Sequence, residues 1–256
     1  MPQSKKDKFQ TKREEFISQK LVDKLDRLEA KFTRRLNSYF RNLTTKIANG
    51  NIDSVTKRDI NKLNSIIEDM YKETGKAASK DLNKEIKSLT GEPSKVRVGA
   101  VGTDLRVFSD KLSKDMLQDF QAKIRTEINS LPTTGVDKAD FKRAIRKSSK
   151  SYRGRLKTIA RNETTRAVND RRIEASKKSK FVQGVQFLAI LDKNTTDICD
   201  ARHGKILKLD SPELPAYTPP LHHNCRSILS PVSVLENPTF ASTTELKAVP
   251  KPAFDD

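Results

Sequence analysis

The sequence predicts a mostly helical α+β protein, in which long N-terminal antiparallel helices precede a small C-terminal α+β module stapled by a Cys/His cluster. Apolar residues recur every three or four positions over much of the first ninety residues, and the main β-rich runs lie beyond residue 180. Both cysteines lie near the C-terminus, each close to a histidine. The expected organisation is a helical hairpin over 1–92, connecting helices over 93–150, an α+β module over 151–235 and an extended tail over 236–256.

Two apolar stripes predict the hairpin. Between Leu21 and Ile47, steps of three and four residues place apolar side chains on one helix face, and residues 49–51 supply a stop. A second stripe runs from about residue 54 to residue 89, with Gly75 as a candidate break. Two amphipathic helices joined by a short loop are expected to pack on each other in antiparallel fashion.

The remaining elements follow in order. Residues 95–108 alternate in places and predict a loose hairpin or an ordered loop, and residues 109–130 carry a third helical stripe. Asp137 is expected to cap a short helix, and a break at residues 149–151 leads into a helix that ends near residue 179. Beyond it lie strand-like runs at 182–190 and 205–209, so two or three strands beside a helix form a unit that cannot bury much by itself.

Four residues near the C-terminus have the types and number of a closed tetrahedral zinc site. Cys199 and His203 form a C-x₃-H pair, and His222 and Cys225 form an H-x₂-C pair after a loop. The chain has no other cysteine and one other histidine. A structural zinc ion is therefore expected. A Cys199–Cys225 disulfide and a set of unpaired residues remain open as alternatives.

Positive charge is concentrated in one stretch. The chain has 51 Lys and Arg against 33 Asp and Glu, a net charge of +18, and residues 142–180 hold fifteen basic residues against three acidic ones. Such an excess favours a polyanionic partner over a merely solvated helix face, because self-repulsion otherwise destabilises the chain. We expect non-specific contact with double-stranded DNA, with an acidic protein surface as the alternative. The expected DNA-contacting residues are Lys142, Arg143, Arg146, Lys147, Lys150, Arg153, Arg155, Lys157, Arg161, Arg171 and Arg172.

The order of motifs over about residues 150–232 resembles a known family. A helix that contains residues 160–167 comes first, and a strand that leads to Asp192 follows. The segment 199–204 and the proline-rich ending 219–226 complete the order. Together they resemble the minor head, or head-morphogenesis, proteins of bacteriophages that are similar to protein F of phage Mu. Many of these relatives carry a C-x-x-C pair whose first cysteine is replaced here by Thr196, so His203 is expected to complete the site.

This resemblance implies a structural virion component without enzymatic activity. It implies a place inside the head near the portal vertex, and in the host cytoplasm during assembly. The implied partners are the portal protein, other head proteins and packaged DNA. No run of eighteen apolar residues exists and the basic N-terminus lacks an apolar segment, so neither a membrane span nor a secretory signal is expected.

The competing class is a metal-dependent hydrolase or nuclease that uses the Cys/His cluster. A catalytic zinc keeps one coordination position open and works with a nearby carboxylate, which Asp197 or Asp200 could supply. Glu163 is another carboxylate beside the motifs, but an ion pair with Arg161 or Arg166 is expected for it. A fully occupied metal site would favour the structural class, and an open position would favour the enzyme.

Overall fold

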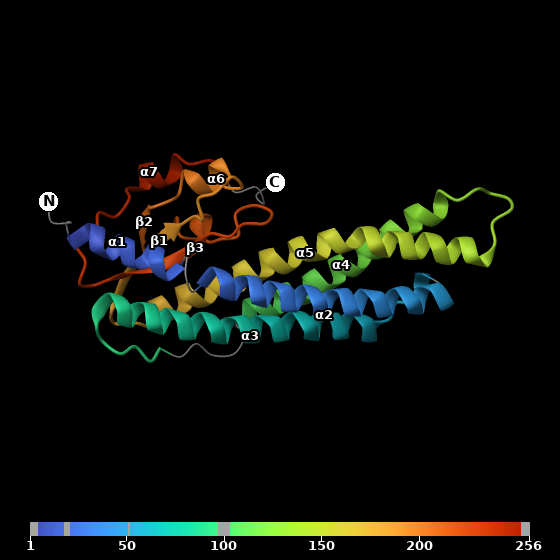
Figure 1. The fold of residues 1–256 in the computed structure, drawn as a ribbon, viewed down its shortest axis with the longest axis horizontal. Helices are drawn as coiled ribbons and strands as arrows, with labels where there is room; N and C mark the ends of the chain where they lie inside the picture. Colours follow the sequence, from blue (N-terminus) through green and yellow to red (C-terminus); the bar gives the residue numbers. More distant parts are fainter. Residues whose placement is uncertain (1–4, 18–20, 51, 97–102, 252–256) are drawn as a thin grey trace. The chain divides into compact units, whose positions relative to one another are not determined.

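The structure is a computed structural model that describes residues 5–17, 21–50, 52–96 and 103–251 (Figure 1). Most of these residues are helical, and a small antiparallel sheet lies toward the C-terminus, which confirms the predicted mostly helical α+β class. In chain order the elements are α1 (Lys5–Phe16), α2 (Val22–Asn49), η2 (Ile52–Ser54), α3 (Lys57–Thr90), α4 (Thr103–Asn129), α5 (Lys138–Lys177), β1 (Val182–Leu188), α6 (Asp197–Asp200), β2 (Ile206–Lys208), η3 (Pro215–Tyr217), β3 (Ile228–Ser233) and α7 (Thr243–Lys247).

The chain forms two compact units, and α2, α3 and α5 each contribute one part to both. The sheet unit comprises the described residues within 1–28, 73–100 and 161–256. The bundle unit comprises those within 29–72 and 101–160. The division into four consecutive segments that the sequence suggests remains a prediction. Among the described residues, no helix combines the length and the apolarity that crossing a membrane requires.

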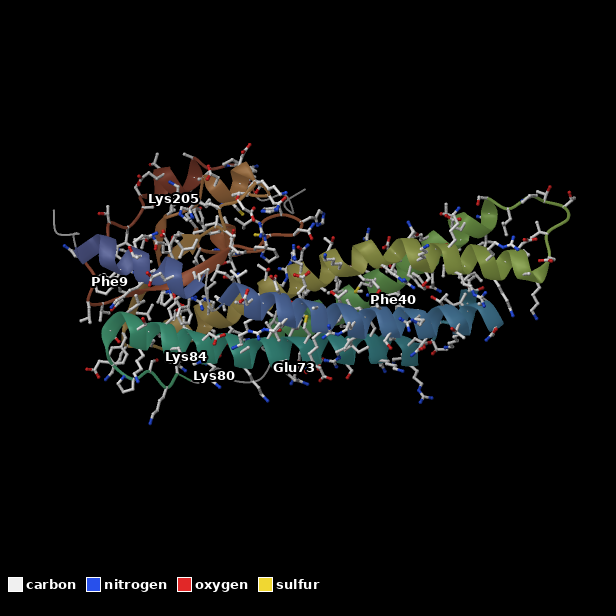
Figure 2. All side chains as sticks on the ribbon, in the orientation of Figure 1. Phe9, Phe40, Glu73, Lys80, Lys84 and Lys205 are labelled. Atoms are coloured by element: carbon white, nitrogen blue, oxygen red, sulfur yellow. The ribbon has the colours of Figure 1, made fainter. Side chains whose placement is uncertain are left out.

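The bundle unit packs segments of four helices around aromatic residues. The ring of Phe40, labelled in Figure 2, lies 4.9 Å from that of Phe120 and 5.2 Å from that of Tyr152, measured between centroids. The Tyr152 hydroxyl donates a hydrogen bond to the carbonyl of Met116, so its polar atom is satisfied inside the core. In this unit α2 and α3 run antiparallel, because Arg35 pairs with Asp69 while Lys46, eleven residues later, pairs with Asp59.

Two expected helix breaks are wrong. α3 continues through Gly75, where an added Cβ would lie 3.1 Å from Cγ of Arg171. Glycine therefore makes room for a neighbouring side chain there and does not end the helix. α5 likewise continues through residues 149–151. The Ser151 hydroxyl donates to the carbonyl of Ser148, a hydrogen bond within the helix, and does not cap a new one.

Two other segments differ from the expectation in part. α4 already includes Leu105 and Val107, which the sequence places in a loose hairpin or loop, while residues 97–102 lie outside the described part. The C-terminal tail is not extended throughout, since α7 forms behind a capping box of Ser242 and Glu245. The apolar pattern of the sequence does not predict α1.

The sheet has the order β2-β1-β3, with β1 antiparallel to both neighbours. Val185 and Phe187 of β1 pack with Leu229 of β3 on one face, in the cluster that also contains both cysteines. Leu188 and Ile228 point to the other face and pack against apolar residues of α3 and α5. Because both faces are covered, the module gains an apolar core from helix segments that are distant in sequence.

A buried ion pair connects α3, α5 and β3 inside the sheet unit. Glu85 and Arg172 are 1% and 0% exposed and pair directly with each other. Arg172 Nε also donates to the carbonyl of Leu229 over 2.7 Å, and the Ser230 hydroxyl donates to Glu85. These additional hydrogen bonds offset part of the desolvation cost of burying two charges.

We predict that Arg172→Met destabilises the protein by about 3–5 kcal/mol, because it leaves the Glu85 carboxylate buried without its partner. Arg125→Met is the matched control, since it breaks the exposed pair with Asp53 and should cost about 0–1 kcal/mol. Urea unfolding measures both. Adding Glu85→Gln to Arg172→Met should recover part of the loss. Equal costs for the two single variants would contradict the structural importance of the buried pair.

Candidate metal centre and basic surface

Three of the four predicted metal ligands lie together in the sheet unit. Cys199 of α6, His222 and Cys225 place their ligand atoms within 4.8 Å of one another. The Sγ atom of Cys199 lies 3.1 Å from Nε2 of His222 and 3.7 Å from Sγ of Cys225. Both cysteines are buried free thiols, and their separation is much longer than a disulfide bond of about 2.0 Å. These three residues are called the Cys/His group below.

The spacing of the Cys/His group suits a tetrahedral metal ion. Tetrahedral bonds of about 2.3 Å to sulfur and about 2.0 Å to nitrogen separate two sulfur ligands by about 3.8 Å, and a sulfur from a nitrogen by about 3.5 Å. The two sulfur atoms already match this geometry. The His222 ring would move away from Cys199 by about half an ångström. The Cys/His group therefore could hold a metal ion with little rearrangement.

The hydrogen bonds within the Cys/His group favour the thiolate form of Cys225. The hydrogen bond with Cys199 is the main cause that lowers the pKa of Cys225 to about 4, and His222 adds to the effect against the opposing cost of burial. The hydrogen bond to Cys225 and burial together raise the pKa of Cys199. The pKa of His222 is raised, chiefly by its hydrogen bond to Cys225. A thiolate and a neutral imidazole are the forms that bind a metal, so the lowered pKa favours the binding form of Cys225, whereas Cys199 and His222 would lose a proton on binding.

The other two histidines lie outside the group. Nδ1 of His203 accepts a hydrogen bond from the amide of Ala189 over 3.2 Å, just after β1. Nδ1 of His223 lies 3.4 Å from the side-chain nitrogen of Asn162 on α5. His203, which the sequence predicts as the fourth ligand, therefore does not lie with the other three. The structure brings together Cys199, His222 and Cys225 without it.

A small polar cavity opens beside the Cys/His group. Thr196, at the N-cap of α6, lines it together with Cys199 and His222, and its hydroxyl accepts a hydrogen bond from the Cys199 amide. Ser227 also lines it and donates its hydroxyl to Sγ of Cys199 over 3.1 Å. Thr196, which replaces the first cysteine of the C-x-x-C pair, is thus adjacent to the candidate metal position. Asp197 and Asp200 are exposed and do not belong to the group.

A row of polar side chains on α5 holds the segment that carries Cys225. Asn162, Thr165, Asn169 and Arg172 are spaced three, four and three residues apart, which places them on one helix face. We call this row the polar ladder. Its hydrogen bonds join Asn162 Oδ1 to the Asn224 amide (2.8 Å), the Thr165 hydroxyl to the Cys225 carbonyl (2.9 Å), Asn169 to the Ser227 carbonyl (3.1 Å) and the Leu229 amide (2.8 Å), and Arg172 to the Leu229 carbonyl (2.7 Å).

Sequence reasoning missed the polar ladder. Its signal is the regular spacing of Asn162, Thr165 and Asn169 inside a helix, where such residues usually face solvent or a cap. The ladder also explains a strained position, because Asn224 adopts φ 60° and its amide is held by Asn162. The segment between His222 and β3 is therefore fixed by side chains of α5.

Two further contacts join the motifs. Arg226 pairs with Asp192 over 2.6 Å, and this hydrogen bond holds the pKa of the Asp192 carboxyl below its usual value. Glu163 is buried and pairs with Nε of Arg166 over 3.3 Å, which confirms the ion pair expected from the sequence. The carboxylates at both motif positions thus pair with arginines.

The predicted DNA-contacting residues differ in burial. Lys142 and Arg161 are partly buried, and Arg171 and Arg172 are 5% and 0% exposed. The guanidinium groups of Arg171 and Arg172 pair with carboxylates in the sheet unit, so DNA contact by these two residues remains a prediction without an exposed charge to support it. The exposed residues, all on the bundle-unit part of α5, are Arg143, Arg146, Lys147, Lys150, Arg153, Arg155 and Lys157, and we call them the basic face.

The basic face is a continuous stripe. Arg143, Arg146, Lys150, Arg153 and Lys157 follow at steps of three and four residues, so about one cation occurs per helical turn of 5.4 Å. The last four of these form no ion pair with any residue that the structure describes. Their charges are therefore available to an external anion.

Comparison with known proteins places these features in a family. Residues 122–230 match the family model described as Phage Mu protein F like protein. This segment is similar to the phage Mu protein F-like family. It contains the basic face, the polar ladder and the Cys/His group, and the match confirms the resemblance seen in the motifs. The family points to a phage head-morphogenesis protein, with other head proteins as partners and the virion as its location.

No curated protein matches the chain, and no solved structure matches it either.

Proposed function

We propose that this protein is a structural minor head protein of a tailed bacteriophage, which acts in head assembly near the portal vertex. Inside the head it contacts packaged DNA or the portal protein. The observation that carries this proposal is the family match over residues 122–230, since it includes the basic face and the Cys/His group together. The portal position rests on the family resemblance alone.

The basic face supports the contact with DNA. Its unpaired cations are solvent-exposed and regularly spaced along one helix. This arrangement favours contact with the phosphate backbone over contact with base edges. The exposed aromatic residue nearest to them is Phe141, which gives little basis for stacking on single-stranded bases. We therefore propose duplex binding without sequence preference.

The Cys/His group supports a structural zinc ion held by Cys199, His222 and Cys225. Such an ion would join α6 to the segment before β3, two parts of the sheet unit with little regular secondary structure between them. A small module gains folding free energy from a cross-link of this kind. The residues present fit zinc in ligand type and in sulfur spacing.

We predict one zinc ion per chain, and its loss in Cys199→Ser, His222→Ala and Cys225→Ser. His203→Ala and His223→Ala are the matched controls, and both should retain zinc because neither side chain belongs to the Cys/His group. Elemental analysis of the purified variants measures the content, and thermal unfolding measures the stability that zinc adds. Retained zinc in His222→Ala with loss in His203→Ala or His223→Ala would show that the ligand assignment is wrong.

A gain of function tests the same geometry. Thr196→Cys adds a thiol to the cavity beside Cys199 and His222, where it can provide a fourth ligand. Zinc affinity should rise in this variant, as measured by competition with a chelator. Thr195→Cys, one residue earlier and lining the same cavity, is the control, and an equal rise in both variants would argue against a specific fourth position.

We predict that replacing Arg143, Arg146, Lys150, Arg153 and Lys157 by glutamine lowers the slope of log K against log salt for duplex DNA. Each lost phosphate contact should reduce it by about 0.9. The matched control removes five exposed cations from α2 and α3 of the same unit: Arg34, Arg41, Lys57, Arg58 and Lys62. An equal change of the salt slope in both variants would show that the basic face has no special role in DNA binding. Absence of binding by the native protein at low salt would favour an acidic protein partner.

The second candidate function is a metal-dependent hydrolase or nuclease. It is favoured by one observation, that three ligands gather beside a polar cavity where a closed structural site would have four. Against it, Asp192 and Glu163 pair with arginines and do not form an acid–base pair.

We therefore expect no cleavage of DNA or RNA with zinc, magnesium or manganese present, under salt conditions where the protein binds them. Gel assays with supercoiled plasmid and with RNA measure this. Turnover that disappears in Asp200→Asn or Glu163→Gln, with zinc content retained, would establish the enzyme instead.

A further inference from the structure

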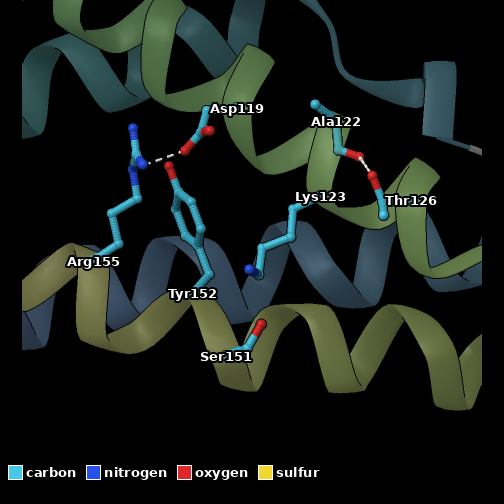
Figure 3. Close-up of a pocket in the computed structure, with 7 residues that line it drawn as sticks. All are labelled: Asp119, Ala122, Lys123, Thr126, Ser151, Tyr152 and Arg155. Carbon is cyan, nitrogen blue, oxygen red and sulfur yellow. Dashed lines mark hydrogen bonds and ion pairs between the residues drawn. The ribbon is translucent and has the colours of Figure 1, made fainter.

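A polar cavity lies in the groove between α4 and α5 of the bundle unit (Figure 3). Its volume is about 210 Å³, which leaves room for a phosphate group and several waters, since one water occupies about 30 Å³. The lining consists of Asp119, Ala122, Lys123 and Thr126 from α4 and of Ser151, Tyr152 and Arg155 from α5.

Ion pairs between the two helices fix the cations at both ends of the groove. Lys147 pairs with Glu127 over 2.9 Å, and Arg155 pairs through Nε with Asp119 over 2.8 Å. Lys147, Ser151 and Arg155 are four residues apart and so form one line along α5. The cavity lies along this line, beside the basic face. Its position is therefore set by contacts that are already formed.

Lys123 supplies a cation to the cavity from the opposite helix. Figure 3 shows its side chain extending from α4 toward Ser151 of α5. It forms no ion pair with the residues that the structure describes. Arg155 pairs through Nε with Asp119 and also interacts with the hydroxyl of Tyr152, so its guanidinium is held at the cavity. Buried Tyr152 lies beneath, with its hydroxyl donated to the Met116 carbonyl.

The charge of the lining selects the type of anion. Lys123 and Arg155 carry two positive charges and Asp119 carries one negative charge, so the lining has a net charge of one positive. A phosphodiester has a single negative charge and matches this net charge, whereas a phosphate monoester carries nearly two. The hydroxyls of Ser151 and Thr126 now donate to carbonyls of their own helices and can rotate toward a bound oxygen.

We propose that this cavity binds one backbone phosphate of duplex DNA, between Lys123 of α4 and Arg155 of α5. The proposal rests on the proposed contact of the basic face with DNA and deepens it. It adds Lys123, which lies outside residues 142–180, and a pocket that fixes the register of the backbone on the helix. A phosphate held between two helices is anchored, whereas one on the open stripe can exchange freely.

Titration of the full-length protein with a random-sequence duplex at several salt concentrations tests this inference. Lys123→Gln should weaken binding severalfold and lower the salt slope by about 0.9. Lys111→Gln is the matched control, because it removes an exposed lysine from the same helix without touching the cavity. Ser151→Leu fills the cavity without changing any charge and should weaken binding as well. Circular dichroism confirms that these exposed substitutions leave the fold intact.

Each other outcome overturns the proposal in a distinguishable way. Equal slopes for Lys123→Gln and Lys111→Gln, with native binding intact, would refute the cavity and leave the basic face in place. Weakening by Lys123→Gln alone, with Ser151→Leu unchanged, would show that Lys123 acts as a surface charge and not through the cavity. No binding by the native protein at low salt would overturn both this inference and the proposed DNA contact.

Discussion

The polar ladder of α5 is the constraint on which the rest of the sheet unit depends. Residues 224–227 precede β3, and side chains of α5 provide hydrogen-bond partners for their backbone and for the amide of Leu229. A buried backbone group without a partner costs about 1–3 kcal/mol, so these contacts decide the path of the segment. The position of Cys225, the entry of β3 into the sheet and the contact of Arg172 with Glu85 all follow from that path.

One helix thus serves two kinds of chemistry. In the bundle unit α5 presents arginines and lysines that remain solvated, and their charges are available to a polyanion. In the sheet unit the same residue type is buried, and Arg172 acts as a hydrogen-bonding cross-link. Composition alone counts both as positive charge. Burial separates them, because a guanidinium paired with a buried carboxylate no longer contributes to the external field.

The two cysteines of the candidate metal centre differ in how firmly the surrounding structure holds them. Cys225 is held through its carbonyl by Thr165, while Cys199 lies on a helix of a single turn capped by Thr196. A metal ion bound between them would connect the fixed part to the less supported one. The ligand set of two thiols and one imidazole suits such a structural role, and Thr196 lines the cavity beside it.

The sequence by itself determined the features that depend on neighbours along the chain. Helical stripes located α2 and α3, and the three-residue spacing of Glu163 and Arg166 produced their ion pair. The pairing of cysteines with histidines also predicted that Cys199, His222 and Cys225 lie together. Only the tertiary structure decided that His203 lies outside this group, because His203 bonds to the backbone beside β1. It likewise decided that Arg171 and Arg172 are buried and that Gly75 continues its helix. These outcomes depend on segments about ninety residues apart that meet only when α3 packs on α5.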